Sequence, residues 1–453
     1  MVRFVKIQKP KKMNGEKDYP IDKLTKPIQR FIQNQKAGGI VLGISVVLAL
    51  FFANSPLSEA YHHFFENKIG FQFNGNSYLE YSLHHWINDG LMAIFFFVVG
   101  LELKREIVGG ELSNPRKALL PIGAAIGGMV VPALVYIVLN SSSEAQSGWG
   151  IPMATDIAFA LGVLYLLGDK IPLTLKIFLT ALAIVDDLGA VLVIAFFYTS
   201  DISTLSLIIG LGFVLIMFIG NKIGIRNVLF YAIIGIIGVW TAFLLSGVHA
   251  TIAAVLAAFT IPADMKIKES VYLNKIQNYL NQFKAIDPND KIPTLTNNQL
   301  HILEEVKTDT NKIIPPLQRL EHAMHPFVTF AIIPIFALAN AGVSLNFDWD
   351  QLLNTNVAIG VFLGLLLGKV LGIVGFTWLF VKMKIAPFPE GMNMKNLFGL
   401  SLLASIGFTM SLFVTSLAFS NEEHITQAKI GIFTASIIGG IFGYIVLNKS
   451  IKK

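Results

Sequence analysis

The sequence predicts an all-α polytopic membrane protein with about 12 transmembrane helices, inverted repeats and two crossing broken helices. Of its residues 54% are hydrophobic and only 14% are charged, and its mean hydropathy is +0.62. Apolar runs of membrane-spanning length recur from residue 37 to residue 447. This composition excludes a soluble globular protein, and the lack of cysteine excludes disulfides and thiolate metal sites.

Each of the apolar runs is long enough, or nearly so, to cross a bilayer as a helix. The runs 227–245 and 248–262 are the shortest, and only Ser246 and Gly247 separate them. The predicted spans are 37–53, 84–107, 118–139, 149–167, 172–199, 204–221, 227–245, 248–262, 322–345, 355–381, 396–419 and 425–447.

The predicted membrane domain has two parts, and polar segments lie before, between and after them. A basic tail (1–36) precedes spans 1–8 in residues 37–262, and a short basic end (449–453) follows spans 9–12 in residues 321–448. A polar stretch, 263–320, lies between the two parts, and we expect it to be an ordinary cytosolic insertion.

Two segments of this insertion have sequence patterns that predict different local structures. Lys266–Phe283 has the pattern of an amphipathic helix, whereas Pro288–Asn298 has that of irregular chain.

Basic residues mark one side of the membrane. Most Lys and Arg lie in the tail, in the basic end and in loops on the same side, so the positive-inside rule places both termini in the cytosol. We interpret the net charge of +6 as topology and contact with anionic lipid, and not as a nucleic-acid footprint. On the opposite side, Ile69–Phe73 and Ser77–Tyr81 flank Asn74-Gly75. That pair tolerates the positive φ of a tight turn and predicts a β-hairpin at 69–81.

Three aspartates lie inside the apolar runs. Asp156 is in span 4, and Asp186 and Asp187 are in the middle of span 5. On insertion scales a carboxylate at the centre of a membrane helix costs ~2.5–3.5 kcal/mol, so such residues usually serve an ion path, a proton relay or a buried counter-charge. Adjacent helical residues point about 100° apart. We therefore expect Asp186 and Asp187 to have different partners, one facing a cavity and the other a neighbouring helix.

Span 4 has the composition of a broken helix. Gly148, Gly150 and Pro152 weaken its hydrogen-bond ladder just before Thr155 and Asp156. A broken helix exposes N–H groups at one break and C=O groups at the other, and Asp156 suits the positive N-terminal end. The alternative is that Asp156 is only an N-cap at a shallow depth, because Thr-Asp is a cap-like pair.

Span 10 carries Lys369 near its middle. Snorkelling to the surface is difficult from that depth, so this lysine needs a carboxylate or the carbonyl end of a broken helix. Pairing with Asp186 would lower the joint cost of burial, although a buried pair need not add net stability.

Four other positions complete the intramembrane candidates. Gly399 and Gly407 make span 11 the second helix that is broken or closely packed, late in the chain as span 4 is early. Asp89 lies at the outer end of span 2. His249 precedes span 8, where a satisfied polar residue is the ordinary interpretation.

Titratable side chains also gather at the cytosolic ends of spans 2 and 9. Glu102 and Glu106 lie four residues apart and so share a helix face, and span 9 opens with Glu321, His322 and His325. Because histidine titrates nearest neutral pH, they form a candidate proton-sensing cluster. Solvated polar helix ends are the alternative.

Long motifs surround these positions. They are NDGLMAIFFFVVGLELKRE (88–106), ATDIAFALGVLYLLGDKIPLTLKIFLTALAIVDDLGA (154–190), SGVHATIAAVLAAFTIP (246–262), RLEHAMHPFVTFAIIPIFALANAGVSL (319–345), LGKVLGI (367–373) and IGFTMSLF (406–413). Together these motifs resemble one known family, the NhaA family of bacterial sodium/proton antiporters.

The resemblance implies that spans 3–5 and 10–12 are inverted repeats in which spans 4 and 11 cross. It places Na⁺ and proton binding at Asp187 and Asp186, and charge compensation at the helix breaks on Thr155, Asp156 and Lys369. Asp89, His249 and Gly407 are further candidate positions. The implied cytosolic pH-sensing cluster is Glu102, Glu106, Glu321, His322 and His325.

The implied function is secondary active export of Na⁺ or Li⁺ in exchange for protons across the bacterial cytoplasmic membrane. Ions and protons would compete for the buried aspartates in an alternating-access cycle that is electrogenic and pH-regulated. The resemblance implies a transporter and not an enzyme, without a cofactor. It also implies a homodimer formed through the 69–81 hairpin, with membrane lipid as the other partner.

Two rival functions fit less well. A passive cation channel would not couple Na⁺ to H⁺, and an unpaired lysine in its path would repel cations. An intramembrane aspartyl protease takes its aspartates from separate helices that bear Tyr-Asp and Gly-x-Gly-Asp. Here Asp186 and Asp187 are adjacent, and the sequence LLGD (166–169) lacks the first glycine.

Overall fold

The computed structural model describes residues 37–73, 76–141, 144–199, 202–286, 294–344 and 355–451. The basic tail 1–36 and the Asn74-Gly75 turn lie outside the described residues. So do residues 288–293 of the stretch expected to be irregular, and residues 452–453.

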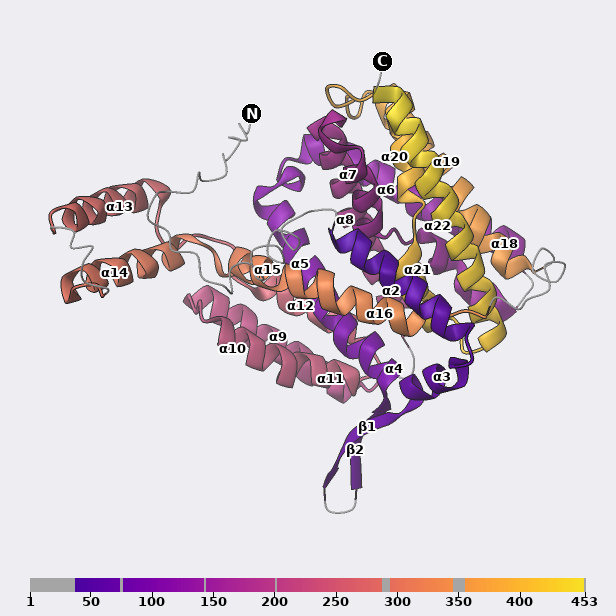
Figure 1. Cartoon of the computed structure of the whole chain (residues 1–453), viewed down its shortest axis with the longest axis horizontal. Helices are drawn as coiled ribbons and strands as arrows, with labels where there is room; N and C mark the ends of the chain where they lie inside the picture. Colours follow the sequence, from indigo (N-terminus) through magenta and orange to yellow (C-terminus); the bar gives the residue numbers. More distant parts are fainter. Residues whose placement is uncertain are drawn as a thin grey trace.

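Helices account for most of the described chain (Figure 1). The elements of its first half are α2 (Ala37–Ala53), α3 (Ser58–Glu66), β1 (Lys68–Phe73), β2 (Asn76–Ser82), α4 (Leu83–His85), η1 (Trp86–Leu91), α5 (Met92–Gly109), η2 (Glu111–Ser113), α6 (Pro115–Asn140), η3 (Glu144–Met153), α7 (Ile157–Leu166), η4 (Gly168–Lys170) and α8 (Leu173–Phe197).

The regular elements in the described residues of the second half are all helices. Its elements are α9 (Thr204–Ile223), α10 (Val228–Ile233), η5 (Ile234–Trp240), α11 (Thr241–Leu244), α12 (Ala250–Thr260), α13 (Glu269–Lys284), α14 (Asn297–Ile313), α15 (Pro316–Phe327), η6 (Val328–Ile332), α16 (Ile333–Asn340), α18 (Asn356–Leu363), η7 (Gly364–Gly368), α19 (Lys369–Lys382), α20 (Met394–Ala404), α21 (Phe408–Ala418) and α22 (Glu422–Ile451).

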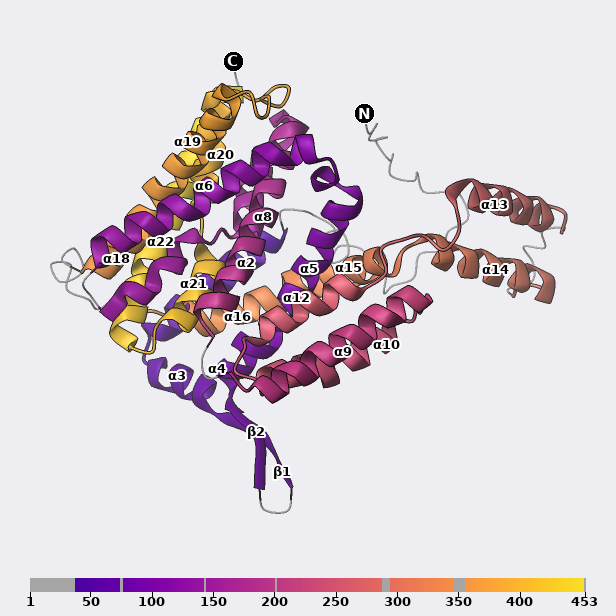
Figure 2. The ribbon, with the colours of Figure 1, turned by 180° about the vertical axis from the view of Figure 1, so that it is seen from behind.

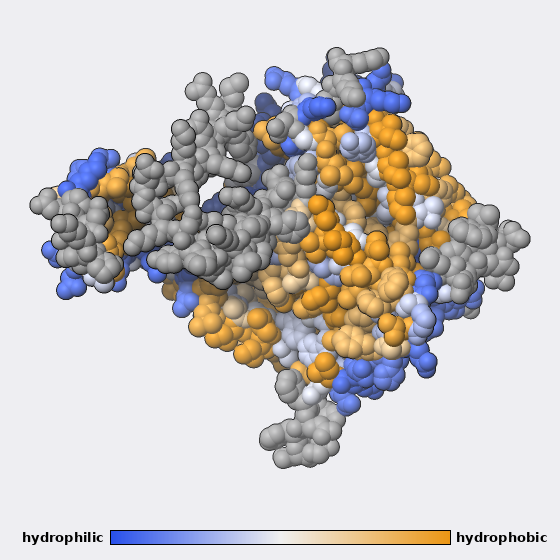
Figure 3. Space-filling view, in the orientation of Figure 1, coloured by the Kyte–Doolittle hydropathy of each residue, from blue (hydrophilic) through white to orange (hydrophobic). Residues whose placement is uncertain are grey.

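The helices have the length and surface of a membrane domain. Within the described residues, seven are long and apolar enough to cross a bilayer, or up to nine if each of two bent pairs is one span. Val228–Leu244 and Ala250–Thr260 are shorter apolar stretches. Many large apolar side chains are exposed on the outside of the bundle (Figure 3), where lipid would replace water. The predicted all-α polytopic membrane fold is thereby confirmed, while the count of twelve spans stays a prediction.

Two helices are broken at membrane depth. The first runs as the 3₁₀ segment η3, becomes extended at Ala154–Asp156, and resumes as α7. The second is α20 followed by α21, which are bent by 47° at a break of a few residues. Irregular backbone at such a depth is tolerated only where protein or a cavity satisfies its polar groups. The polar groups at each break therefore need partners, and a backbone hydrogen bond joins the two breaks.

Glycines also allow the helices α6 and α19 to approach closely. A Cβ built on Gly372 of α19 would collide with the backbone of Gly127 in α6, and one built on Gly127 would collide with the carbonyl of Gly372. Small residues at helix contacts let backbones pack together where the solvent is lipid. This contact fixes α19, and hence Lys369 at its start, against α6.

A β-hairpin projects from one end of the bundle (Figure 1). Its strands β1 and β2 are antiparallel, with Ile69 opposite Tyr81 and an irregularity in register between Ile69 and Phe71. The indole N–H of Trp86 donates to the Ile69 carbonyl (3.0 Å), so the hairpin is attached to the start of the span that contains α5.

The polar insertion forms a helical pair that extends sideways from the bundle (Figures 1 and 2). Its first helix, α13, begins at Glu269, close to the predicted amphipathic helix. Its second helix, α14, was not predicted. A capping box between Thr296 and Gln299 begins it at Asn297. Asn297 and Asn298, the last residues of the stretch expected to be irregular, are therefore helical instead. The inward face of α14 includes Asp309, a polar residue that breaks the apolar periodicity on which sequence prediction depends.

Candidate functional site

The two helix breaks are joined by backbone and side-chain hydrogen bonds. The Asp156 amide donates to the Ile406 carbonyl (2.7 Å), and the Ser411 hydroxyl donates to the Ile151 carbonyl (2.8 Å). A Cβ at Gly407 would lie 3.1 Å from the Ala154 carbonyl oxygen and closer still to the Ser411 hydroxyl. Glycine at 407 therefore allows the two irregular segments to cross.

Asp156 caps two half-helices at once. One carboxylate oxygen accepts from the Phe159 amide (2.9 Å) at the start of α7. The other accepts from the amide (3.0 Å) and the hydroxyl (2.5 Å) of Thr409 at the start of α21. The cap interpretation is thus correct locally, and the side chain is only 2% exposed. A single carboxylate faces the positive ends of two helix dipoles.

Lys369 lies on the opposite face of the crossing, paired with Asp186. Its ammonium donates directly to Asp186 and to the Thr155 hydroxyl (2.7 Å). The Thr155 oxygen lies 2.6 Å from that Asp186 oxygen and 2.9 Å from the Ala404 carbonyl at the end of α20. None of these side chains reaches solvent, which excludes snorkelling. The ion pair and the carbonyl together compensate the buried ammonium.

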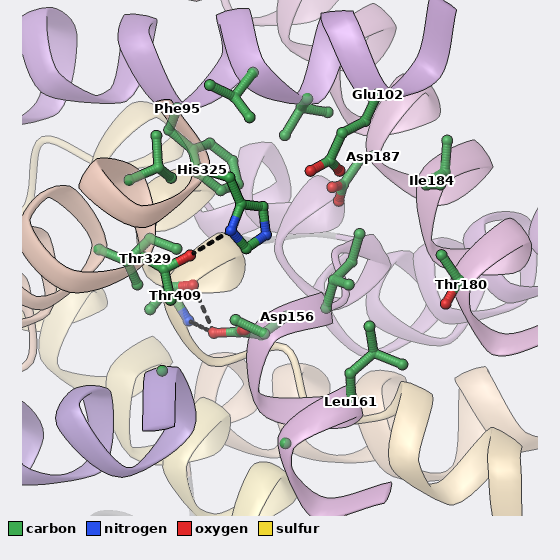
Figure 4. A pocket seen from close by; sticks show the side chains of 18 of the residues that line it. Phe95, Glu102, Asp156, Leu161, Thr180, Ile184, Asp187, His325, Thr329 and Thr409 are labelled. Atoms are coloured by element: carbon green, nitrogen blue, oxygen red, sulfur yellow. Dashed lines mark hydrogen bonds between the residues drawn. The ribbon is translucent and has the colours of Figure 1, made fainter. Parts of the chain in front are cut away.

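Asp187 has a different environment from its neighbour. Both of its oxygens are buried and have no hydrogen-bond partner among the described residues. It lines a cavity of about 480 Å³ that Asp186 does not reach. Figure 4 shows Glu102 of α5 beside Asp187, with Asp156 and Thr409 across the cavity. The adjacent aspartates therefore point to different surroundings, one to a cavity and one to a neighbouring helix.

Most of the predicted cytosolic cluster lines the same cavity. Glu102, Glu321, His322 and His325 contribute to its wall, whereas Glu106 does not. The cluster joins α5, which carries Glu102, to α15, which carries Glu321, His322 and His325.

Arg105 also lines this cavity and forms two ion pairs there. Its guanidinium pairs with Glu321 (2.6 Å) and with Glu106 (2.9 Å), and the other Glu106 oxygen accepts the Glu111 amide (3.0 Å). Arg105 was not predicted as a site residue, because in the sequence the basic pair after Leu103 indicates only topology. Thr409 was not predicted either, because an uncharged residue in an apolar run gives no signal.

Asp89 and His249 lie outside this cavity. The Asp89 carboxylate is 3.4 Å from Nε2 of His249 and 3.3 Å from Nε2 of His85. Asp89 is near the start of the helical run that ends with α5, whereas Glu102 is close to its end. The candidate residues thus form two groups, one around the crossing and its cavity and one toward the hairpin end.

Comparison with known proteins identifies the protein family of this chain. The model of a family described as Na⁺/H⁺ antiporter 1 matches residues 29–447. The chain belongs to this family. It is 49% identical over 434 residues to the Na⁺/H⁺ antiporter NhaA of Oleidesulfovibrio alaskensis, covering 96% of each chain.

Other relatives agree over nearly the whole length. The Na⁺/H⁺ antiporter NhaA of Sulfurimonas denitrificans is 48% identical over 94% of this chain and 96% of its own. That of Phocaeicola vulgatus is 46% identical over 92% and 94%. The resemblance found in the motifs is confirmed, and the family is one of transporters and not of enzymes.

Proposed function

We propose that the protein is a secondary active antiporter that exports Na⁺ or Li⁺ in exchange for protons. The observation that carries the proposal is Asp187, a buried carboxylate with two unpartnered oxygens in a cavity lined by further titratable groups. Hard cations such as Na⁺ prefer oxygen ligands, and a proton can occupy the same oxygens. Family membership agrees with this assignment.

Competition at Asp187 would couple the two ions. An ionised carboxylate without a partner is costly at membrane depth, so the site is stable with a proton or with a cation but not empty. Reorientation of the loaded site alone then yields exchange. A passive channel would need no competition between Na⁺ and protons at this carboxylate.

Asp186 is the second proposed proton site. In this structure it is neutralised by Lys369. If two protons enter for each Na⁺ that leaves, one net charge moves inward, and a potential of about 100 mV then contributes ~2.3 kcal/mol to export. Exchange would therefore be electrogenic.

The two crossing broken helices would be the elements that move when the ion site changes its access from one side of the membrane to the other. Asp156 compensates the two facing helix N-termini, and Lys369 lies with Thr155 beside the carbonyl end of α20. Because each helix end keeps its counter-charge within the crossing, α7, α20 and α21 can shift together without exposing an unpaired dipole to lipid.

The remaining expectations complete the proposal. The cluster of Glu102, Glu106, Glu321, His322 and His325 would sense cytosolic pH at the cavity mouth. Both termini would lie in the cytosol, with the protein in the bacterial cytoplasmic membrane. The described part of the 69–81 hairpin projects beyond the bundle (Figure 1), as a dimer contact would require.

The test is dye-detected exchange in everted vesicles. With an imposed pH gradient, Na⁺ or Li⁺ but not K⁺ should collapse the gradient. Asp187→Asn should abolish this response while the protein still inserts, because its side chain can neither bind a proton nor supply the charge for Na⁺. The control is Glu304→Gln, which removes an exposed charge from α14. Robust exchange by Asp187→Asn would remove Asp187 from the site, and Na⁺ current without proton movement would indicate a channel.

A further inference from the structure

Thr180 is a polar residue in the wall of the Asp187 cavity, two helical turns before Asp187. Both residues belong to α8, and Ile184 is the third residue of this helix that lines the cavity. Figure 4 shows all three side chains in this wall. Because seven residues separate Thr180 from Asp187, the two lie on nearly the same face of the helix, roughly 10 Å apart along its axis.

The hydroxyl of Thr180 differs from that of other helical threonines in the chain. A threonine inside a helix often donates to the carbonyl four residues earlier. Thr415 and Thr434 do so, at 2.7 and 2.8 Å. For Thr180 there is no hydrogen-bond partner among the described residues. Since its side chain is only partly buried and borders the cavity, the hydroxyl oxygen can bind a water molecule or an ion there.

Thr180 also precedes Asp187 on the way into the cavity. It lies between Asp187 and the start of α8 at Leu173. The starts of α2 and α15 border the cavity as well, since Gly38 and Glu321 line it. In the proposed orientation these helix starts face the cytosol. A cation that enters between them therefore passes Thr180 before it reaches Asp187.

The wall next to Thr180 is otherwise apolar. Ile184 lies between Thr180 and Asp187, and Ala158 and Leu161 of α7 line the same cavity. A cation that moves along an apolar wall loses water ligands without replacement, which is costly. Oxygen is the ligand that a hard cation such as Na⁺ prefers, and the Thr180 hydroxyl supplies one at this position.

The charges around the cavity favour the entry of a cation. Arg105 is the one permanent positive charge in the described lining, and it is ion-paired. Lys176, one turn before Thr180, is not among the lining residues, and its ammonium lies over the Tyr165 ring (5.2 Å from the centroid). The lining residues with carboxyl groups are Glu102, Asp156, Asp187 and Glu321.

We propose that the Thr180 hydroxyl is an intermediate ligand for the transported cation. It replaces one water molecule of the entering Na⁺ or Li⁺, and the cation then moves on to the unpartnered oxygens of Asp187. This inference rests on the proposed antiport function. No covalent bond forms or breaks, because the cation only exchanges one oxygen ligand for another.

The experiment measures the Na⁺ concentration that gives half-maximal exchange, in everted and in right-side-out vesicles. Thr180→Val removes the hydroxyl and keeps a branched side chain. It should raise this concentration about fivefold when Na⁺ is added at the face where the cavity opens, as expected for the loss of one neutral hydrogen-bonding group. The maximal rate, and the half-maximal concentration at the other face, should stay unchanged. Thr180→Ser keeps the hydroxyl and should behave like the unmodified protein at both faces.

Thr434→Val is the matched control, because the Thr434 hydroxyl already donates to a backbone carbonyl and its side chain is exposed on α22. Its values should equal those of the unmodified protein. The inference is overturned if Thr180→Val has no effect, or has an equal effect at both faces. It is also overturned if Thr180→Ser impairs exchange more than Thr180→Val, since the methyl group and not the hydroxyl would then matter. Absence of exchange in the unmodified protein would instead overturn the proposed function, so the two failures are distinguishable.

Discussion

Two adjacent aspartates with opposite surroundings are the central feature at the scale of residues. Asp186 is tied to Lys369 and Thr155, whereas the oxygens of Asp187 have no partner among the described residues and face the cavity. The helix itself causes this division, since neighbouring residues point about 100° apart. One carboxylate is thus ion-paired with a lysine, and the other is left open to the cation or proton of the proposed antiport.

Breaking the Lys369–Asp186 pair should reveal its structural role. Lys369→Met leaves Asp186 buried without its partner, and loss of one member of a buried pair costs about 3–5 kcal/mol. We expect a marked fall in the melting temperature of the purified protein in detergent. Lys369→Met combined with Asp186→Asn should recover most of this loss, because no uncompensated charge remains.

The matched control for this cycle is Lys395→Met, which removes an exposed ammonium from α20 and should leave the melting temperature nearly unchanged. If the double variant is no more stable than Lys369→Met, the cost does not arise from an unpaired carboxylate. Thermal unfolding followed by tryptophan fluorescence measures all of these variants.

At the scale of elements, close helix contacts hold the site in place. The backbones of α6 and α19 approach at Gly127 and Gly372, directly beside the helix start that carries Lys369. Gly372→Ala should push the two helices apart, lower the melting temperature and reduce exchange, since its Cβ would collide with backbone and not with a flexible side chain. Gly375→Ala on the same helix has open space and is the control. Equal effects of the two substitutions would contradict this account.

The α13–α14 pair is held by a buried carboxylate outside the membrane. Lys312 (2.6 Å) and Lys275 (2.9 Å) bond to Asp309, and Tyr279 donates to it as well (2.9 Å). These bonds, Lys312 first, hold the pKa of Asp309 well below its usual value. A lowered pKa means that the carboxylate stabilises the pair above the unfolded pKa of about 4, and that this contribution is lost as pH falls below it.

Asp309→Asn should therefore loosen this pair by the same amount throughout the range of about pH 5–9, since the carboxylate of the unmodified protein stays ionised there. Amide hydrogen exchange of residues 269–284 and 297–313 is the measurement, and faster exchange in the variant is the expected result. Asp264→Asn is the control, because the Asp264 carboxylate is exposed where it pairs with Arg226. A difference that grew steadily from pH 5 to pH 9 would refute the assignment to a carboxylate with a lowered pKa.

At the scale of the whole molecule, the described part of the hairpin projects away from the helices (Figure 1). It extends past the end of the bundle (Figures 1 and 2), and an isolated two-stranded ribbon is marginal in water. A second copy of the chain would supply the missing strand contacts. Replacing residues 70–80 by a short Gly-Ser linker should convert a dimer to a monomer in detergent, as measured by light scattering. Glu59→Gln on α3 is the control, and a dimer that survives the replacement would exclude the hairpin as the main contact.

The membrane fold class, the family and most residues of the candidate site follow from the sequence alone. Strong apolar runs have few alternatives in lipid, and charges within them stand out because they are costly. The weakening of the helices near Pro152 and Gly407 also follows from residue type. Asp186, Asp187, Asp156 and Lys369 can therefore be selected from the order of residues along the chain.

Which of these residues meet depends on the tertiary packing. The packing joins Asp156 to Thr409 across two half-helices, pairs Lys369 with Asp186, and places Arg105 between two glutamates. It also accounts for α14, whose inward face includes a polar residue. Such partners lie far apart in the chain, and an uncharged residue or an ordinary surface arginine gives no local signal. Their roles come from contacts between helices, which periodicity along one segment does not encode.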